Sequence, residues 1–128
     1  MATILVVDDE PSLRRLLRTA LERAGYGVLE AADGPQALLL ARAEQPALIL
    51  LDVALPGLSG LEVCRRLRAE PANSRTPVLL ISGVLPPNEA TKLAEAGASG
   101  WLTKPFTPAT LLERVEALLT ARTGSPGR

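Results

Sequence analysis

The sequence predicts an α/β protein, a three-layer sandwich in which helices cover both faces of a five-stranded parallel sheet. Three short, continuous apolar runs are typical of strands buried on both faces: residues 4–7, 48–51 and 78–81. Two weaker segments with glycine in or beside them, residues 26–31 and 99–102, suit strands at the sheet edges. Helical periods separate the strands, and this strict alternation implies right-handed crossovers.

We expect the strand order 2-1-3-4-5, because it places the three most apolar strands inside and the two weaker ones at the edges. In this order the first and third strands are neighbours at the switch point, where ligands bind beyond the carboxyl ends of the strands. Asp8, Asp9 and Asp52 all follow these two strands. Three of the four aspartates are therefore predicted to gather at one edge of the sheet.

Five helices are predicted between and after the strands. Pro11 suits the first turn of the first helix and Gly25 its end, while residues 33–36 (DGPQ) and 59–62 (SGLE) are typical of capping boxes. Arg14, Arg15, Arg18 and Glu22 are expected on the polar face of the first helix. The inner faces are predicted to carry Leu13, Leu16, Leu17, Ala20, Leu21 and Ala24 in the first helix, Val63, Cys64 and Leu67 in the third, Ala90, Leu93 and Ala94 in the fourth, and Leu111, Val115, Leu118 and Leu119 in the fifth.

Composition excludes several classes of function. Basic and acidic side chains are balanced at 14 each and form no long basic run, so we expect neither direct nucleic-acid binding nor membrane binding. No apolar run approaches the length of a membrane span, and the single Cys64 cannot form an internal disulfide. We expect a cytoplasmic protein with one domain over residues 1–121 and a flexible tail or the start of a linker over residues 122–128.

The three aspartates would raise one another's pKa values unless a cation compensated for their charge. Mg²⁺ suits this sparse set, because it takes oxygen ligands and is commonly held by one or two carboxylates plus a phosphate. Zinc is a poor candidate, since the chain has no histidine. Ser82 and Lys104 end the fourth and fifth strands at the same edge, so a hydroxyl and an ammonium group join the acids.

Four segments, in order, resemble the signature segments of response regulator receiver domains: VVDDEP at 6–11, LLDVALPGLSG at 50–60, LLISG at 79–83 and GWLTKPF at 100–106. The resemblance implies a flavodoxin-like fold and a phosphoacceptor domain of a two-component phosphorelay, similar to the chemotaxis regulators. Such a domain accepts a phosphoryl group from a histidine kinase or phosphotransfer protein and switches conformation to control a partner or output domain.

The resemblance also implies a role for each residue of the site. Asp52 would be the phosphoacceptor, Lys104 the cation that pairs with the phosphoryl group, and Ser82 the hydroxyl that donates a hydrogen bond to it. These residue types suit the chemistry, because a carboxylate can form an aspartyl phosphate and a transferred phosphoryl group carries charge on its equatorial oxygens.

Mg²⁺ is the one cofactor that the resemblance implies. Asp9, Asp52 and the backbone carbonyl of Ala54 would be direct ligands, and Asp8 would act through metal-bound water. The family also implies a cis peptide bond before Pro105. Trp101 stands where the family has a tyrosine or phenylalanine that rotates as the hydroxyl residue moves, so Ser82 and Trp101 are the expected switch residues.

The resemblance also implies partners and a class of activity. The fourth helix, fifth strand and fifth helix would bind the downstream partner, and the protein would be a monomer or a phosphorylation-dependent dimer. We expect no enzymatic activity beyond the part that the protein takes in its own Mg²⁺-dependent phosphorylation and dephosphorylation. Two alternatives stay open: an interaction module that works without phosphorylation, and a Mg²⁺-dependent phosphohydrolase with Asp52 as nucleophile. The haloacid-dehalogenase type of the latter needs a second aspartate where this chain has Ala54.

Overall fold

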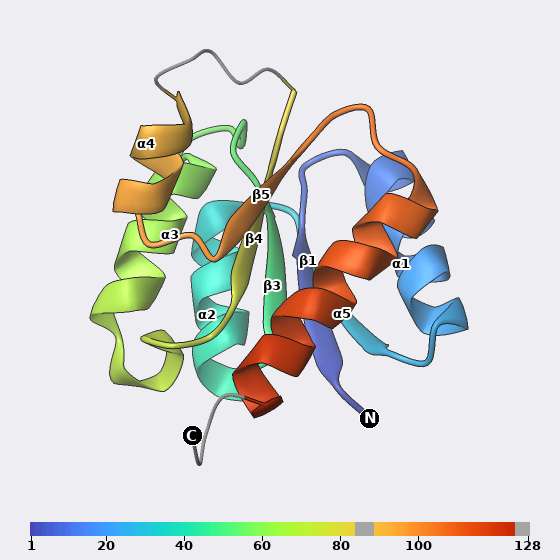
Figure 1. Ribbon diagram of the computed structural model, residues 1–128. Coiled ribbons are helices and arrows are strands. Elements are labelled where there is room, and N and C mark those ends of the chain that lie inside the picture. The colour runs from blue at the N-terminus through green and yellow to red at the C-terminus, as the bar shows by residue number, and fades with distance from the viewer. Residues whose placement is uncertain (84–88, 125–128) are drawn as a thin grey trace.

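The computed structural model describes residues 1–83 and 89–124. Within these residues, strands and helices alternate along the chain (Figure 1). The elements are β1 (Thr3–Val7), α1 (Pro11–Arg23), β2 (Gly27–Ala31), α2 (Gly34–Glu44), β3 (Leu48–Asp52), α3 (Gly60–Ala69), the short 3₁₀ helix η1 (Pro71–Asn73), β4 (Val78–Ser82), α4 (Glu89–Glu95), β5 (Gly100–Thr103) and α5 (Pro108–Gly124). All strand pairs are parallel and the order is β2-β1-β3-β4-β5, which confirms the predicted fold class and strand order.

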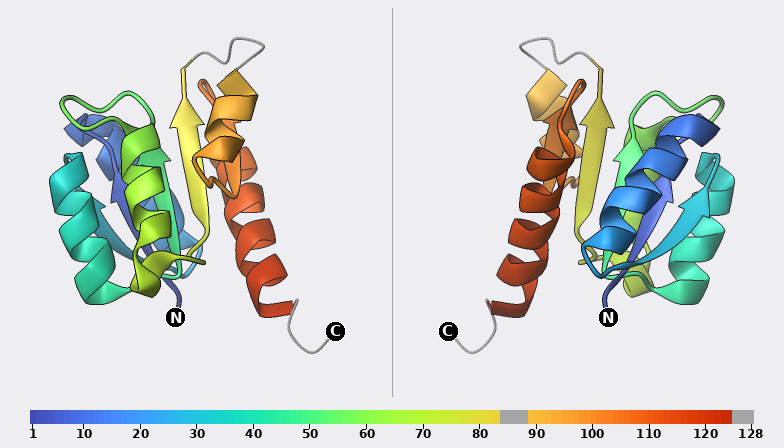
Figure 2. Two further views of the ribbon diagram at one scale, coloured as in Figure 1. Left: turned by 90° about the vertical axis from the view of Figure 1, so that its left-hand side faces the viewer. Right: turned by 90° about the vertical axis from the view of Figure 1, so that its right-hand side faces the viewer.

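Two helical layers enclose the sheet (Figures 1 and 2). Buried side chains of α2, α3 and α4 form a core on one face, and those of α1 and α5 form a core on the other. Strand residues alternate between the two cores: in β1, Leu5 and Val7 join the first, and Ile4 and Val6 the second. Every residue of β3 and β4 is buried, as expected for central strands of a parallel sheet.

The cap residues predicted for α2 and α3 are present, but neither helix forms a complete capping box: the side chain of Glu62 pairs with Arg65 and Arg66. The side chains of Asp33 and Ser59 accept hydrogen bonds from the N–H groups of Gln36 and Glu62. In a complete capping box the side chain of Gln36 would accept from Asp33, but it accepts from the N–H of Ala32 instead. Each helix start is therefore fixed by its own cap residue.

Three residues expected on inner helix faces are exposed: Leu16, Ala24 and Ala94. Helix α1 buries Leu17 and Leu21, and successive side chains are rotated by about 100° about the helix axis, so Leu16 lies outside the buried face, in a surface hollow shared with Pro108 and Leu112 of α5. The same geometry turns Ala94 away beside the buried Leu93, and Ala24 lies after the last residue of α1. Gly25 has the expected left-handed conformation, with φ of 97°.

Helix α5 continues to Gly124, past the residue at which we expected the domain to end. Residues 125–128, the rest of the predicted tail, lie outside the described residues. Cys64 is buried in the core between α3 and the sheet. Among the described helices, none is long and apolar enough to cross a membrane.

We predict that Gly60→Ala destabilises the protein. Gly60 is the first residue of α3, and a Cβ there would overlap the carbonyl oxygen of Asp52 and lie 2.8 Å from Cα of Val53. Both are backbone atoms at the end of a buried strand, so the start of α3 would have to shift. We expect urea denaturation to show a loss of about 1–3 kcal/mol in the free energy of unfolding.

Gly83→Ala is the matched control for this substitution. A Cβ at Gly83 would meet no described atom within 4 Å, and its φ is not in the left-handed region. We expect a change within about 0.5 kcal/mol in the same denaturation experiment. Equal effects of the two substitutions would contradict the close approach of α3 to β3.

Candidate functional site

The register of the sheet places the end of β1 beside the end of β3. Val7, the last residue of β1, is paired with Leu51. Asp8 directly follows Val7 and Asp52 directly follows Leu51, so the two carboxylates lie at the same level on neighbouring strands. The loop after β1 adds Asp9. Strand pairing alone therefore brings two acids together, and the loop supplies the third.

Asp8, Asp9 and Asp52 form a compact acidic cluster. Each offers one carboxylate oxygen, and these oxygens all lie within 4.8 Å of one another. Asp8 is 1% exposed and Asp52 is 4% exposed, whereas Asp9 is exposed. The acidic cluster opens into a surface hollow of about 380 Å³, which is also lined by Glu10, Pro11, Ala54 and Lys104. A metal ion or a small anion can therefore reach the buried acids from solvent.

Asp8 is the most buried acid of the cluster. Its Oδ1 accepts a hydrogen bond of 2.8 Å from the N–H of Glu10, while its buried Oδ2 has no partner among the described residues. Burial is the main cause that raises the pKa of Asp8 to about 6; the bond from Glu10 opposes this rise, and the neighbouring Asp52 adds to it. A cation at this place would relieve the cost of ionising Asp8.

Asp52 is held from two sides. Its Oδ1 accepts a hydrogen bond of 2.9 Å from the N–H of Ala54, and its Oδ2 pairs with Nζ of Lys104 at 2.9 Å. Burial of Lys104 disfavours its charge, but the bond to Asp52 and the charges of nearby acids outweigh this, so the pKa of Lys104 is raised. A permanent ammonium group thus lies against the buried carboxylate.

Ser82 ends β4 and is buried, paired in register with Thr103 of β5. Its carbonyl oxygen accepts a hydrogen bond of 2.7 Å from the N–H of Lys104, so the backbones of these two residues are joined at the same edge. Ser82 does not line the hollow that contains the acids. The peptide bond between Lys104 and Pro105 is cis.

Trp101 lies in β5, away from the acids. Its side chain is partly buried against the core formed with α2, α3 and α4, and its carbonyl oxygen accepts a hydrogen bond of 2.7 Å from Nη1 of Arg114. The structure therefore brings Lys104 into contact with Asp52, places Ser82 beside them, and leaves Trp101 on the flank of the sheet.

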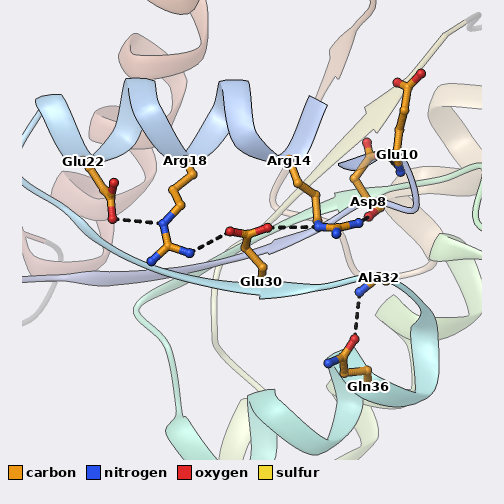
Figure 3. Close-up of polar contacts among 8 residues, drawn as sticks. All are labelled: Asp8, Glu10, Arg14, Arg18, Glu22, Glu30, Ala32 and Gln36. Carbon is orange, nitrogen blue, oxygen red and sulfur yellow. Dashed lines mark hydrogen bonds and ion pairs between the residues drawn. The ribbon is translucent and has the colours of Figure 1, made fainter. Parts of the chain in front are cut away.

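Sequence reasoning did not connect Arg14 with the site. Nη1 of Arg14 donates a hydrogen bond of 2.7 Å to the carbonyl oxygen of Asp8, and Nε pairs with Oε1 of Glu30 at 3.0 Å (Figure 3). The amphipathic pattern placed Arg14 correctly on the polar face of α1. No pattern in the sequence shows that this face borders the acidic loop, because the contact spans β1, β2 and α1.

Comparison with known proteins gives the same family at the level of sequence. The family model of the response regulator receiver domain matches residues 4–116. The alkaline phosphatase synthesis transcriptional regulatory protein PhoP of Bacillus subtilis is 45% identical over 116 residues, which are 91% of this chain and 48% of that protein. The phosphate regulon transcriptional regulatory protein PhoB of Pseudomonas aeruginosa is 42% identical over 125 residues, 98% of this chain and 54% of PhoB. The chain thus spans about half the length of these curated relatives.

Solved structures extend the match to the fold. The chemotaxis protein CheY4 of Vibrio cholerae has a TM-score of 0.89 and 36% identity, covering 92% of this chain and 98% of that one. A CheY-like receiver domain protein of Methanospirillum hungatei has a TM-score of 0.91 and 26% identity, covering 98% of both chains. Sequence, strand order and structural neighbours agree, and the chain belongs to the response regulator receiver domain family of two-component systems.

Proposed function

We propose that this receiver domain accepts a phosphoryl group on Asp52 from a histidine kinase or phosphotransfer protein, in a Mg²⁺-dependent reaction. The observation that carries the proposal is the environment of Asp52, a buried carboxylate that contacts an ammonium group and borders two further acids. A carboxylate oxygen of Asp52 would form the new bond to phosphorus while the bond from phosphorus to the donor nitrogen breaks. The product is an aspartyl phosphate.

The residues of the acidic cluster fit Mg²⁺. This ion takes oxygen ligands in octahedral geometry and keeps several waters, which suits a few carboxylates beside an open hollow. Asp9, Asp52 and the carbonyl of Ala54 would be direct ligands. The buried Oδ2 of Asp8, which lacks a partner among the described residues, would accept from a metal-bound water. The bound ion supplies positive charge that compensates for the acids and for the phosphoryl oxygens.

Lys104 and Ser82 would act on the phosphoryl group from the other side. The ammonium group of Lys104 now contacts Asp52, and it would move its hydrogen bond to a phosphoryl oxygen once that oxygen is attached. The hydroxyl of Ser82 would donate a second hydrogen bond. Because the backbone of Ser82 is bonded to that of Lys104, a shift at either residue is passed to the end of β5.

We infer that these shifts favour one of two pre-existing conformations of α4, β5 and α5. Trp101 of β5, whose side chain is partly buried, would follow the movement of Ser82. The surface formed by α4, β5 and α5 would bind a downstream protein or output domain. The protein itself would be a monomer or a phosphorylation-dependent dimer. The domain would therefore act as a switch, and its chemistry would be limited to its own phosphorylation and dephosphorylation.

Phosphorylation is tested with acetyl phosphate and Mg²⁺. We expect intact-mass measurement to show one added phosphoryl group on the parent and none on Asp52→Asn. Asp33→Asn is the matched control, because Asp33 lies outside the acidic cluster and asparagine caps a helix as well as aspartate does. It should gain the group as the parent does. An unmodified parent, or an equal adduct on Asp52→Asn, would rule out Asp52 as the acceptor.

We predict that the metal-free protein loses stability as pH rises from about 4 to about 7. The pKa of Asp8 is raised from 3.8 to about 6 in the folded state. The contribution of protonated Asp8 to the free energy of unfolding is therefore fully present below the unfolded pKa and is lost as pH rises through about 6, a change on the order of 2–3 kcal/mol. Urea denaturation in EDTA at several pH values measures it, and Asp8→Asn should lack this decline.

Glu30 opposes this trend only at the acidic end of the range: its pKa is lowered, first by its bond from Arg18, so its contribution to stability is complete above its unfolded pKa of 4.5 and is lost as pH falls below that value. Added Mg²⁺ should raise the unfolding midpoint more at about pH 7.5 than at about pH 5, since protons and the ion compete for Asp8. A Mg²⁺ effect that is equal at both pH values would contradict binding at the acidic cluster.

A further inference from the structure

Arg14 joins three elements of the fold to one another. It lies near the start of α1, and its side chain, which is 18% exposed, reaches back to the loop after β1 (Figure 3). Nη1 donates to the carbonyl oxygen of Asp8 at 2.7 Å, and Nε donates to Glu30 of β2 at 3.0 Å. One guanidinium therefore ties the acidic loop to the neighbouring strand.

The carbonyl of Asp8 belongs to the peptide group that joins Asp8 to Asp9. Because a peptide group is planar, a bond to its oxygen restrains the backbone of Asp9 relative to that of Asp8. The loop has two further restraints, from the N–H of Asp8 to Ala31 at 3.1 Å and from the N–H of Glu10 to the carboxylate of Asp8 at 2.8 Å. The bond from Arg14 acts on the group that lies between the two acids.

Glu30 neutralises the charge of Arg14 next to the acids by forming an ion pair with it. An unpaired guanidinium would repel a cation or occupy the carboxylates itself. Oε1 of Glu30 holds Arg14, while Oε2 holds Arg18 at 2.7 Å, and Arg18 also pairs with Glu22 at 3.1 Å (Figure 3). Two arginines and two glutamates thus balance one another. Arg14 reaches the loop as part of a neutral network.

We propose that Arg14, held by Glu30, is a positioning residue that fixes the peptide group between Asp8 and Asp9 and thereby sets the Mg²⁺ affinity of the acidic cluster. The inference rests on the proposed function, which assigns the ion to this cluster. Residues that orient ligands without touching the metal change its affinity by about 10–100-fold when they are replaced. Because Arg14 bonds to a backbone group and not to a carboxylate, we expect its replacement to have an effect near the lower end of this range.

Titration calorimetry of the full chain with MgCl₂ tests the proposal. We expect Arg14→Gln to weaken Mg²⁺ binding about tenfold. Glu30→Gln should weaken it in the same direction, because it releases Arg14 toward the acids. Arg18→Gln is the matched control: it removes an ion pair with the same glutamate but no bond to the loop, and its affinity should stay within about twofold of the parent.

A second readout needs no metal. In the metal-free protein, hydrogen exchange of the Glu10 amide, which bonds to the carboxylate of Asp8, should be several-fold faster in Arg14→Gln than in Arg18→Gln. Urea denaturation of both variants separates this local change from a global loss of stability.

The outcomes separate the positioning role from the proposed function. A parent that binds Mg²⁺ and an Arg14→Gln variant that binds it equally well would overturn the positioning role alone. Equal losses in Arg14→Gln and Arg18→Gln would also overturn it, because the effect would then belong to the ion-pair network. A parent that binds no Mg²⁺ would overturn the proposed function and the inference that rests on it.

Discussion

The site depends on one constraint: two carboxylates, Asp8 and Asp52, are buried side by side because the strands that carry them are paired in parallel. The sheet fixes the backbone positions from which both side chains extend. Their charge must therefore be compensated where they lie. The ammonium group of Lys104 meets this need for Asp52, whereas Asp8 keeps a raised pKa and a buried oxygen without a partner among the described residues. The charge of the cluster is therefore not fully compensated by the described residues, and this is the property that the proposed Mg²⁺-dependent function requires.

The fold and the gathering of the acids followed from the sequence, because both depend on strong local patterns. Continuous apolar runs marked β1, β3 and β4, and the strand order then placed Asp8, Asp9 and Asp52 at one edge. The inner faces of the helices were predicted less accurately, since Leu16, Ala24 and Ala94 are exposed. The leucine spacing of α1 allowed a wider buried stripe than the sheet can cover, so Leu16 was assigned to the core although it is exposed. Its true environment depends on how the helix is rotated about its axis, which packing decides.

Contacts of arginine side chains with backbone carbonyl groups were the part that the sequence could not predict. Arg14 meets the carbonyl of Asp8, and Arg114 meets the carbonyl of Trp101. A carbonyl group is present at every residue, so no residue type marks the partner of such an arginine. The carboxylates, in contrast, are marked by their residue type and by the strands they follow. This difference explains why the acids and Lys104 were found together and the arginine beside them was not.

Lys104 and Arg14, the two cationic side chains beside the acids, bond to different kinds of group, and this difference suits them to different roles. Lys104 contacts a carboxylate oxygen of Asp52, so in the proposed reaction this contact would be exchanged for one with the phosphoryl group. Arg14 contacts a backbone carbonyl and pairs with Glu30, so it leaves every carboxylate oxygen of the cluster available. An ammonium group is a compact point charge that can change partner, whereas a guanidinium fork can hold two partners in fixed directions. In the proposed reaction, the lysine would therefore make the contact that changes and the arginine the contact that stays.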